Sequence, residues 1–204
     1  MSQQFISIDA EPLLKVAQEL YKFPKEVLPA MVSAVNRTLD STVTQIKREA
    51  AAEYTVKQKD IADAIKKTRA TKARLSAVAV ASGGQVALYK FRHTPTSPPP
   101  KQRYKQPVKA QVKKNGGKQA VVSEGNKAFV QTVNGQHMIF ARKKGAKRLP
   151  IKKLFALSVP QMIADKNDSK GSLKRIQARA EEMLEKRVNA EIEYRLKKVN
   201  GEAK

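Results

Sequence analysis

Between Asp63 and Asp165 the chain carries a single carboxylate, Glu124. Residues 66–153 hold 22 basic residues against that one acidic residue, whereas the segments before and after are nearly balanced, with net charges of −1 and +3. The middle of the chain therefore cannot neutralise itself through internal ion pairs, and its field must face outward. Because concentrated like charge destabilises a compact state, such a segment is typical of proteins that bind a polyanion such as nucleic acid. An acidic protein partner is the alternative, and solubility alone is a third.

The residue types that catalysis and metal binding require are scarce. The chain has no Cys and only two His, His93 and His137, which lie 44 residues apart. General acid–base chemistry and metal-assisted phosphoryl transfer need clustered carboxylates or His, and the central segment offers one Glu. No Walker-type phosphate loop occurs. The triplets Gly116-Gly117-Lys118 and Gly145-Ala146-Lys147 are therefore predicted to be turns that carry a lysine. We therefore predict no enzymatic activity, no metal and no cofactor, with a nuclease or cell-wall hydrolase as the enzymatic alternative.

Cysteine usage and hydropathy also bear on the compartment. The absence of Cys gives no sign of an oxidising environment. The N-terminus lacks a basic start followed by an apolar run, and the longest uncharged stretch, residues 75–89, is interrupted by Gly83, Gly84 and Gln85. We expect neither a signal peptide nor a membrane span, with a reducing cytoplasm as the default.

The first region, residues 1–72, has helical periodicity. Apolar residues at positions 13–21 predict a short helix that Pro24 interrupts, and Pro24 can open the next helix. The stripe of that long helix comprises Leu28, Met31, Val32, Val35, Leu39, Val43, Ile46 and Ala50. Residues 58–68 read as a third, short helix. Core packing explains these stripes.

The second region, residues 73–165, changes to strand periodicity. Residues 75–81 and 85–91 predict two strands joined by a tight turn at Ser82-Gly83-Gly84. Further hairpins are expected around residues 115–117 and around Asn134-Gly135-Gln136. We predict an antiparallel sheet of about five or six strands over residues 73–152. A long basic, proline-rich loop over residues 93–118 is expected to project from it, because proline cannot donate to a strand ladder.

The third region, residues 166–204, predicts one amphipathic helix of about 27 residues after a polar break at 166–172. Its apolar stripe comprises Leu173, Ile176, Ala180, Leu184, Val188, Ile192, Leu196 and Val199. This stripe packs either on the N-terminal helices or on another chain. The predicted fold class is α+β, with N-terminal helices, a central antiparallel sheet and a long C-terminal helix.

Two groups of basic residues could hold phosphates. The first, in the proline-rich loop, comprises Lys101, Arg103, Lys105, Lys109, Lys113, Lys114 and Lys118. The second, at the exit of the last hairpin, comprises Arg142, Lys143, Lys144 and Lys147, with Arg148 beside them. Many cations along extended chain predict steeply salt-dependent, sequence-independent binding, since Tyr104 alone is no stacking platform. A solvated turn is the alternative for the second group.

Several short strings in this sequence resemble the minor tail protein Z family of tailed bacteriophages and prophages. They are Ala34-Val35-Asn36-Arg37-Thr38, Tyr54-Thr55-Val56, Leu88-Tyr89-Lys90-Phe91, Arg148-Leu149-Pro150-Ile151 and Leu157-Ser158-Val159-Pro160-Gln161-Met162. Their order and spacing match over most of the chain, and the last two strings are the most specific. The Gly-Pro-Ser that usually precedes the last motif is here Ala156-Leu157-Ser158, so the turn there is expected to be built differently.

The resemblance implies a structural tail-completion protein of the virion, at the head-proximal end of the tail, assembled in the host cytoplasm. Implied partners are the tail terminator, the tail tube, head–tail connector proteins, double-stranded DNA and further copies of the chain in a hexamer. A ribosomal or chromatin-like nucleic-acid-binding protein is the rival reading.

The motif residues leave alternatives open. Asn36 and Arg37 either contact a neighbouring subunit or hold a loop of their own chain. Arg148 is either an ion-pair anchor for carboxylates of the outer regions or a DNA contact. With Pro150, Ile151 and Pro160, they are the expected interface or structural motif residues.

Overall fold

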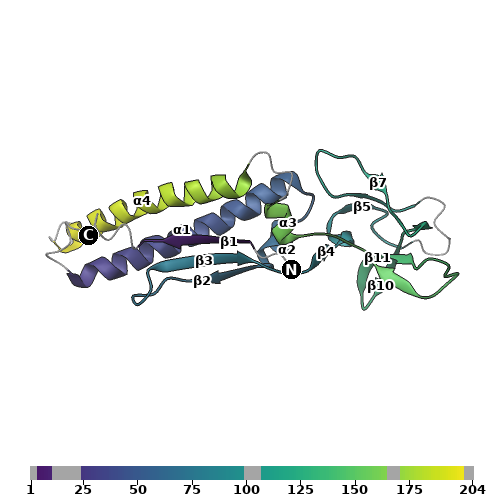
Figure 1. Ribbon diagram of the computed structural model, residues 1–204, viewed down its shortest axis with the longest axis horizontal. Helices are drawn as coiled ribbons and strands as arrows, with labels where there is room; N and C mark the ends of the chain where they lie inside the picture. The colour runs from purple at the N-terminus through teal and green to yellow at the C-terminus, as the bar shows by residue number, and fades with distance from the viewer. Residues whose placement is uncertain (1–3, 11–23, 99–106, 165–170, 200–204) are drawn as a thin grey trace.

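The computed structural model describes residues 4–10, 24–98, 107–164 and 171–199. The molecule is elongated (Figure 1): two long helices and a three-stranded sheet form one half, and several short strands form the other. We call these the helical half and the small-sheet end. Helices and antiparallel sheets together confirm the predicted α+β class. The predicted helix over residues 13–21 and the central part of the proline-rich loop lie outside the described residues.

The two long helices, α1 (Pro24–Glu53) and α4 (Ser172–Val199), run antiparallel. Both begin where the sequence predicts, at Pro24 and after the polar break before residue 172. Their apolar stripes face each other, and Val35, Leu39 and Val188 are each at most 1% exposed. The α4 stripe therefore packs on the N-terminal helix of its own chain, which decides between the two alternatives. Burial of these stripes is the main reason that both helices are stable.

A three-stranded antiparallel sheet packs against this helix pair, in the order β1-β3-β2. Its strands are β1 (Gln4–Asp9), β2 (Ile65–Thr68) and β3 (Ser76–Ala81). Alternate residues of the central strand, Ala77, Ala79 and Ala81, are buried against the helices. Alanine at each inward position lets the sheet approach the helices closely, since successive side chains of a strand point to opposite faces.

The pairing around β3 overturns two sequence predictions. Residues 58–68 are not one helix, because α2 covers only Gln58–Ala62 and β2 follows directly. Residues 75–91 are not a hairpin, because β3 pairs with β1 and β2 while β4 (Gln85–Ala87) pairs elsewhere. The Ser82 N–H donates to the Ala64 carbonyl at 3.0 Å, which continues the β2–β3 ladder past the expected turn. These are non-local hydrogen bonds, and local periodicity carries no information about them.

A short helical junction connects the two halves. Residues Leu88–Lys90, expected to continue a strand, form the 3-10 helix η2 after β4. Strand β4 pairs with β13 (Phe155–Ser158), which leads directly into α3 (Val159–Ile163). Ser158 caps α3: its N–H donates to Gln161 Oε1 at 2.9 Å, and the Gln161 N–H donates to Ser158 Oγ at 3.4 Å. Such a reciprocal cap satisfies two backbone N–H groups that would otherwise lack partners at the start of the helix.

The small-sheet end contains eight short strands within the described residues. Their bounds are β5 (Arg92–Thr94), β6 (Lys109–Gln111), β7 (Gln119–Ala120), β8 (Val122–Ser123), β9 (Asn126–Lys127), β10 (Phe129–Val133), β11 (Gln136–Arg142) and β12 (Ile151–Lys153). They form three separate sheets, β5-β6-β7, β8-β9 and β10-β11-β12, so the prediction of one sheet of five or six strands is wrong.

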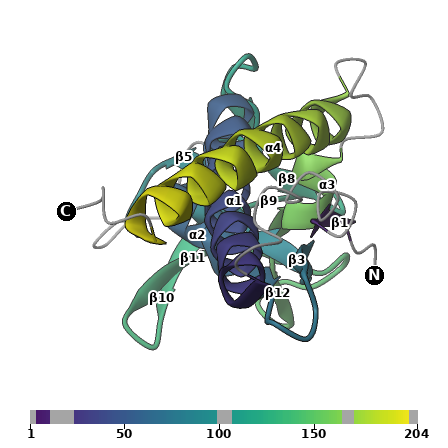
Figure 2. The ribbon, with the colours of Figure 1, turned by 90° about the vertical axis from the view of Figure 1, so that its left-hand side faces the viewer.

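Both later hairpins are confirmed, since β6 pairs with β7 and β10 pairs with β11. The β10–β11 turn places Asn134 at φ 50° and Gly135 at φ 74°, as a two-residue hairpin turn requires. This hairpin projects sideways from the body when the molecule is viewed along its long axis (Figure 2).

Two buried clusters hold the molecule together. One lies between α1, α4 and the three-stranded sheet and includes Leu39, Leu184 and Ala77. The other joins the end of α1 to the junction and the small sheets, and Tyr54 at its centre is fully buried. Because α1 contributes to both clusters, it fixes the small-sheet end relative to the helical half.

Candidate nucleic-acid interface

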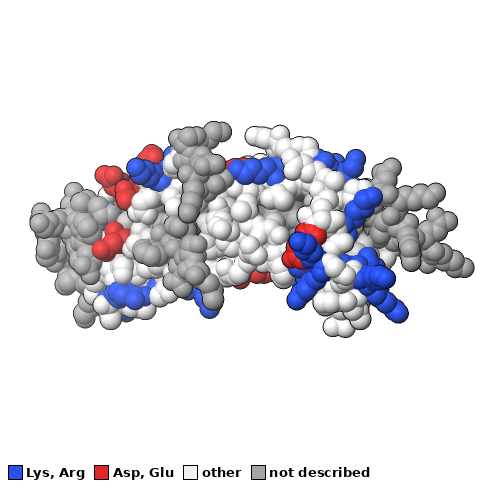
Figure 3. All heavy atoms as spheres, turned by 45° about the vertical axis from the view of Figure 1, so that its right-hand side comes forward, with Lys and Arg blue, Asp and Glu red and all other residues white. Residues whose placement is uncertain are grey.

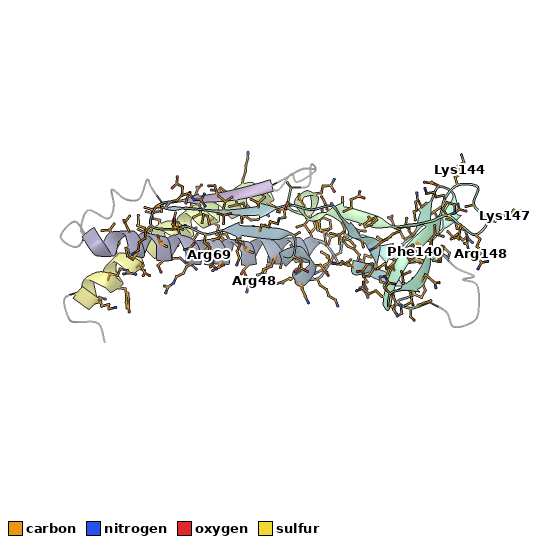
Figure 4. All side chains as sticks on the ribbon, turned by 90° about the horizontal axis from the view of Figure 1, so that it is seen from below. Arg48, Arg69, Phe140, Lys144, Lys147 and Arg148 are labelled. Atoms are coloured by element: carbon orange, nitrogen blue, oxygen red, sulfur yellow. The ribbon has the colours of Figure 1, made fainter. Side chains whose placement is uncertain are left out.

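The small-sheet end carries many exposed cations and few carboxylates. Figure 3 shows Lys and Arg over this end, whereas Asp and Glu lie mostly over the helical half. Their densest group lies in the loop between β11 and β12, residues 143–149, at the tip of the molecule. Lys143, Lys144, Lys147 and Arg148 are all exposed there, and the latter three extend outward from the tip (Figure 4). Except for Arg142, the second predicted group therefore lies in one exposed loop, residues 143–149, which we call the basic loop.

Glu124 holds the basic loop in place. It lies in the turn between β8 and β9, where its Oε2 accepts the Lys144 N–H at 2.9 Å and its Oε1 accepts a hydrogen bond from Lys152 Nζ. From the same turn, Asn126 Nδ2 donates to the carbonyls of Arg142 and Lys143, both at 3.2 Å. The hydrogen bond from Lys152 lowers the pKa of Glu124, followed by the one from the Lys144 main chain. The one carboxylate of the basic segment therefore serves the backbone of the loop and Lys152, and does not pair with the exposed Lys side chains of the loop.

Three of the predicted phosphate contacts already have partners within the chain. The Arg142 guanidinium lies over the Phe129 ring at 5.1 Å from its centroid and is only half-exposed. Lys113 forms an ion pair with Glu53 at 3.1 Å, and Lys118 Nζ donates to Thr94 Oγ1. These contacts bind the cations to the protein surface and make them poorer candidates than the basic loop.

The remaining predicted cations divide into two sets. Lys109 and Lys114 are exposed at the small-sheet end, as is Lys127, which the sequence reading did not single out. Lys127 follows the Glu124 turn directly, and only the folded chain brings it to this end. Lys101, Arg103 and Lys105 lie outside the described residues.

Ion pairs among the described residues explain why the charge stays concentrated. Most of them join segments of the helical half or the junction: Arg37–Glu191 at 3.4 Å, Lys67–Asp40 at 2.8 Å, Arg69–Asp40 at 2.9 Å, Lys90–Asp60 at 2.6 Å and Arg175–Glu49 at 3.6 Å. At the small-sheet end the described residues provide only Glu124–Lys152 and, at its boundary, Lys113–Glu53. The carboxylates are therefore used where the helices pack, and the cations at the tip are left facing solvent.

Asn36 and Arg37 make contacts within the chain. Asn36 Nδ2 donates to the Ala70 carbonyl at 3.1 Å, and the Ala70 N–H donates to Asn36 Oδ1 at 2.9 Å. Arg37 pairs with Glu191 of α4. Asn36 thus holds the chain that leaves β2, and Arg37 links the two long helices.

The two C-terminal motifs also have distinct structural roles. Arg148 is exposed, and no carboxylate of the described residues lies within ion-pair distance, so the anchoring role finds no partner there. Leu149 is 69% exposed and Pro150 is exposed beside it, whereas Ile151 begins β12. Pro160 is buried in the first turn of the capped helix α3. The motif around Pro160 therefore builds the junction, and the motif around Arg148 ends the basic loop.

The described residues offer little for catalysis. They contain no group of three or more His, Asp or Glu side chains arranged to hold a metal ion. His93 Nδ1 lies 2.7 Å from the Phe91 carbonyl, and His137 Nδ1 lies 3.0 Å from Thr132 Oγ1, so each contacts its own hairpin or turn. Of the helices that the structure describes, none has the length and hydropathy to cross a bilayer.

Comparison with known proteins identifies a relationship over nearly the whole chain. The family model described as prophage minor tail protein Z matches residues 14–201. Neither the curated proteins nor the solved structures gave a match. The match includes α1, α4, the junction and the basic loop together.

Proposed function

Because the chain belongs to the prophage minor tail protein Z family, and is therefore a minor component of a phage tail, we propose that it is a non-enzymatic tail-completion protein. It assembles in the host cytoplasm into a ring, with six copies matching the symmetry usual for tail tubes. The ring lies at the head-proximal end of the tail and contacts the tail terminator, the tube and the head–tail connector. Its basic loops hold the end of the packaged DNA.

The observation that carries this proposal is the fixed, exposed basic loop at the end of an elongated subunit. Glu124 and Asn126 hold its backbone, while Lys143, Lys144 and Lys147 remain exposed. A rigid backbone with free ammonium groups suits binding to a regular array of phosphates, because only the side chains need to adjust. Lys109, Lys114 and Lys127 extend this cationic surface.

The kind of contact follows from the residue types. Phosphate contacts from Lys fix the position of DNA but carry no sequence information. A genome end that is held before ejection and released during it needs a grip that does not depend on sequence. If the basic ends of several copies surround a duplex, the DNA phosphates also neutralise the repulsion between the positively charged ends.

The direct test replaces Lys143, Lys144 and Lys147 with Gln and measures binding to short duplex DNA over a range of salt concentrations. Each phosphate contact contributes about 0.9 to the slope of log affinity against log salt, so loss of three contacts should reduce the slope by roughly 2.7. A matched control replaces Lys174, Lys197 and Lys198 of α4 with Gln. These lysines are exposed in the helical half, and the control makes the same change in net charge.

The proposal requires the loop variant to lose affinity and slope while the control stays close to wild type. In complementation of a phage that lacks this chain, loop-variant tails should join heads yet deliver less DNA. Equal losses in both variants would show that only total charge matters, and unchanged binding in the loop variant would show that the DNA contact lies elsewhere.

A further inference from the structure

In the middle of helix α4, different charged residues face the grooves on its two sides. Its acidic residues Glu181 and Glu185 face the groove beside β1, whereas Arg179 faces the groove beside α1 on the other side of the helix. Arg175 and Arg187 lie on the second side too, since they contact Glu49 and Ser41 of α1. The apolar stripe lies between these two sides.

The groove between β1 and α4 is acidic around an apolar floor. It has a volume of about 640 Å³, and Ile8, Ala180 and Leu184 line its floor. Four carboxylates line it, those of Asp9, Glu181, Glu182 and Glu185, and none of the described residues that line it is Lys or Arg. We call it the acidic groove.

A hydrogen bond joins the two walls of the acidic groove, strand β1 and helix α4. Gln177 Nε2 donates to the Ser7 carbonyl of β1 at 3.1 Å and to Glu181 Oε1 at 2.8 Å, which fixes the distance between strand and helix. Glu182 pairs with Lys186 at 2.6 Å, whereas Glu185 has no ion-pair partner among the described residues. The four carboxylates concentrate negative charge in this groove although the whole chain has a net charge of +23. Negative charge repels phosphates, so the acidic groove is not a DNA-binding surface.

The opposite flank, between α1 and α4, is basic. Arg48 and Arg179 line it together with Met183, and neither Arg forms an ion pair within the described part of the chain. The two carboxylates that also line it are already engaged, Asp40 by Lys67 and Arg69, and Glu49 by Arg175. Hydrogen bonds from Lys67 and Arg69 lower the pKa of Asp40. Arg48 and Arg69 both lie along the helical half in the view of Figure 4. We call this surface the basic flank.

We propose that the acidic groove of one copy receives the basic flank of the next copy. The two surfaces are different, lie on opposite sides of the same helix, and have complementary charge and apolar centres. A contact between two different surfaces of identical chains repeats by rotation and closes into a ring when the rotation angle allows. The occupant is therefore a second copy of this chain. This inference rests on the ring in the proposed function and adds which faces build it.

The geometry also separates the two roles of charge. The contact between copies uses the helical half, and the small-sheet end with its basic loop stays outside it. Carboxylates that would repel DNA are covered in the ring, while the loop cations remain accessible. Complementary charge across such a contact gives orientation and speed of association, and the half-buried Met183 of the basic flank adds apolar surface to it.

The first experiment reverses each surface separately. One variant carries Glu181→Lys and Glu185→Lys, and the other carries Arg48→Glu and Arg179→Glu. Juxtaposed like charges cost several kcal/mol, so each variant alone should associate at least about tenfold more weakly than wild type at low salt. Sedimentation velocity of the full-length chain over a range of concentrations measures the association, and circular dichroism checks that both variants fold.

Mixing the two variants gives the decisive result. In an equimolar mixture each wild-type groove meets a wild-type flank, and each reversed groove meets a reversed flank. Association should therefore return toward the wild-type level in the mixture, although each variant alone associates weakly. A contact between two identical surfaces would not give this pattern.

A cross-linking experiment locates the contact. The chain has no Cys, so Ala178→Cys in the groove and Gln45→Cys in the flank introduce the only thiols. A short bis-maleimide should join one variant to the other in a mixture, and should join neither to itself. Val133→Cys, in the projecting β10–β11 hairpin, is the matched control and should join neither partner.

Each outcome decides the matter. If wild type forms rings and both reversal variants form them equally well, the groove proposal is wrong while the ring stands. If wild type remains monomeric at all concentrations and tails assembled from the Ala178→Cys and Gln45→Cys variants give no cross-linked dimer, both the groove contact and the ring are wrong. Capture of a tube or terminator protein at Ala178→Cys on tails would make that protein the occupant and overturn the proposal. DNA binding by the basic loop is measured separately and is unaffected by any of these results.

Discussion

The pair of hydrogen bonds between Asn36 and Ala70 is a strong test of how the helical half is held together. Asn36 is half-buried on α1, and Ala70, which follows β2, is 4% exposed. Asn36→Ala removes one donor and one acceptor at once and leaves the N–H and the carbonyl of Ala70 buried without their partner. A lost hydrogen bond costs about 0.5–1.5 kcal/mol, and a buried polar group left unpaired costs about 1–3 kcal/mol.

Together these terms give an expected loss of about 2–4 kcal/mol in the free energy of unfolding. For a chain of this length, each kcal/mol lowers Tm by about 2–4 °C, so Tm should fall by roughly 5–15 °C. Urea unfolding should show a lower midpoint with an unchanged m value, since the surface exposed on unfolding stays the same. The measurement is made at low protein concentration to exclude effects of association.

Thr44→Ala is the matched control. Thr44 lies on the same helix, is also half-buried, and donates from Oγ1 to the Asp40 carbonyl of its own helix at 2.9 Å. That carbonyl belongs to the helix ladder, so removing the hydroxyl leaves no backbone group unpaired and should change stability little. If Asn36→Ala were as stable as Thr44→Ala, Asn36 would not hold the segment after β2, and a role in contacting another subunit would regain support.

Two further predictions concern the basic loop and the junction. Glu124→Ala should speed hydrogen exchange of the Lys144 N–H, which Glu124 accepts at 2.9 Å, and should leave exchange in α1 unchanged. Because the pKa of Glu124 is lowered in the folded chain, its stabilising contribution is present above the pKa of an unfolded glutamate and is lost as the pH falls through the lower folded value. The wild-type loop should therefore lose Lys144 protection on acidification, and the idea fails if the variant shows the same pH profile. Ser158→Ala should cost about 1 kcal/mol by removing the cap of α3, as seen in urea unfolding; a change no larger than that of Ser7→Ala, an exposed position on β1, would show that the cap contributes nothing.

Much of the local structure could be predicted from the chain because it depends on near neighbours. The stripes of α1 and α4 have a period that only a helix presents on one side, and both helices begin at the expected residues. Asn134-Gly135 predicted its hairpin because these residues adopt the positive φ that the turn needs. The cationic surface of residues 143–148 was predicted because charge is a property of composition.

The errors arose where distant segments pair. Residues 65–68 have no strand periodicity of their own and become a strand because β3 offers them hydrogen bonds. Residues 75–81 look like half of a hairpin, yet both edges of β3 are taken by β1 and β2. The internal partners of Arg142 and Lys113 were missed for the same reason, since Phe129 and Glu53 are distant in sequence.

The amino-acid sequence by itself determined where the two long helices begin, where the two later hairpins turn, and that an excess of positive charge lies in the middle of the chain. Only the tertiary structure decided that Glu124 fixes the backbone of the basic loop, that Asn36 bonds to Ala70 of its own chain, and that grooves of different charge flank α4. The physical reason is the sequence separation over which each kind of interaction acts. Periodicity and charge are set by residues within one or two turns of each other, whereas pairing, burial and the meeting of charges depend on contacts between segments that the chain brings together only when it folds.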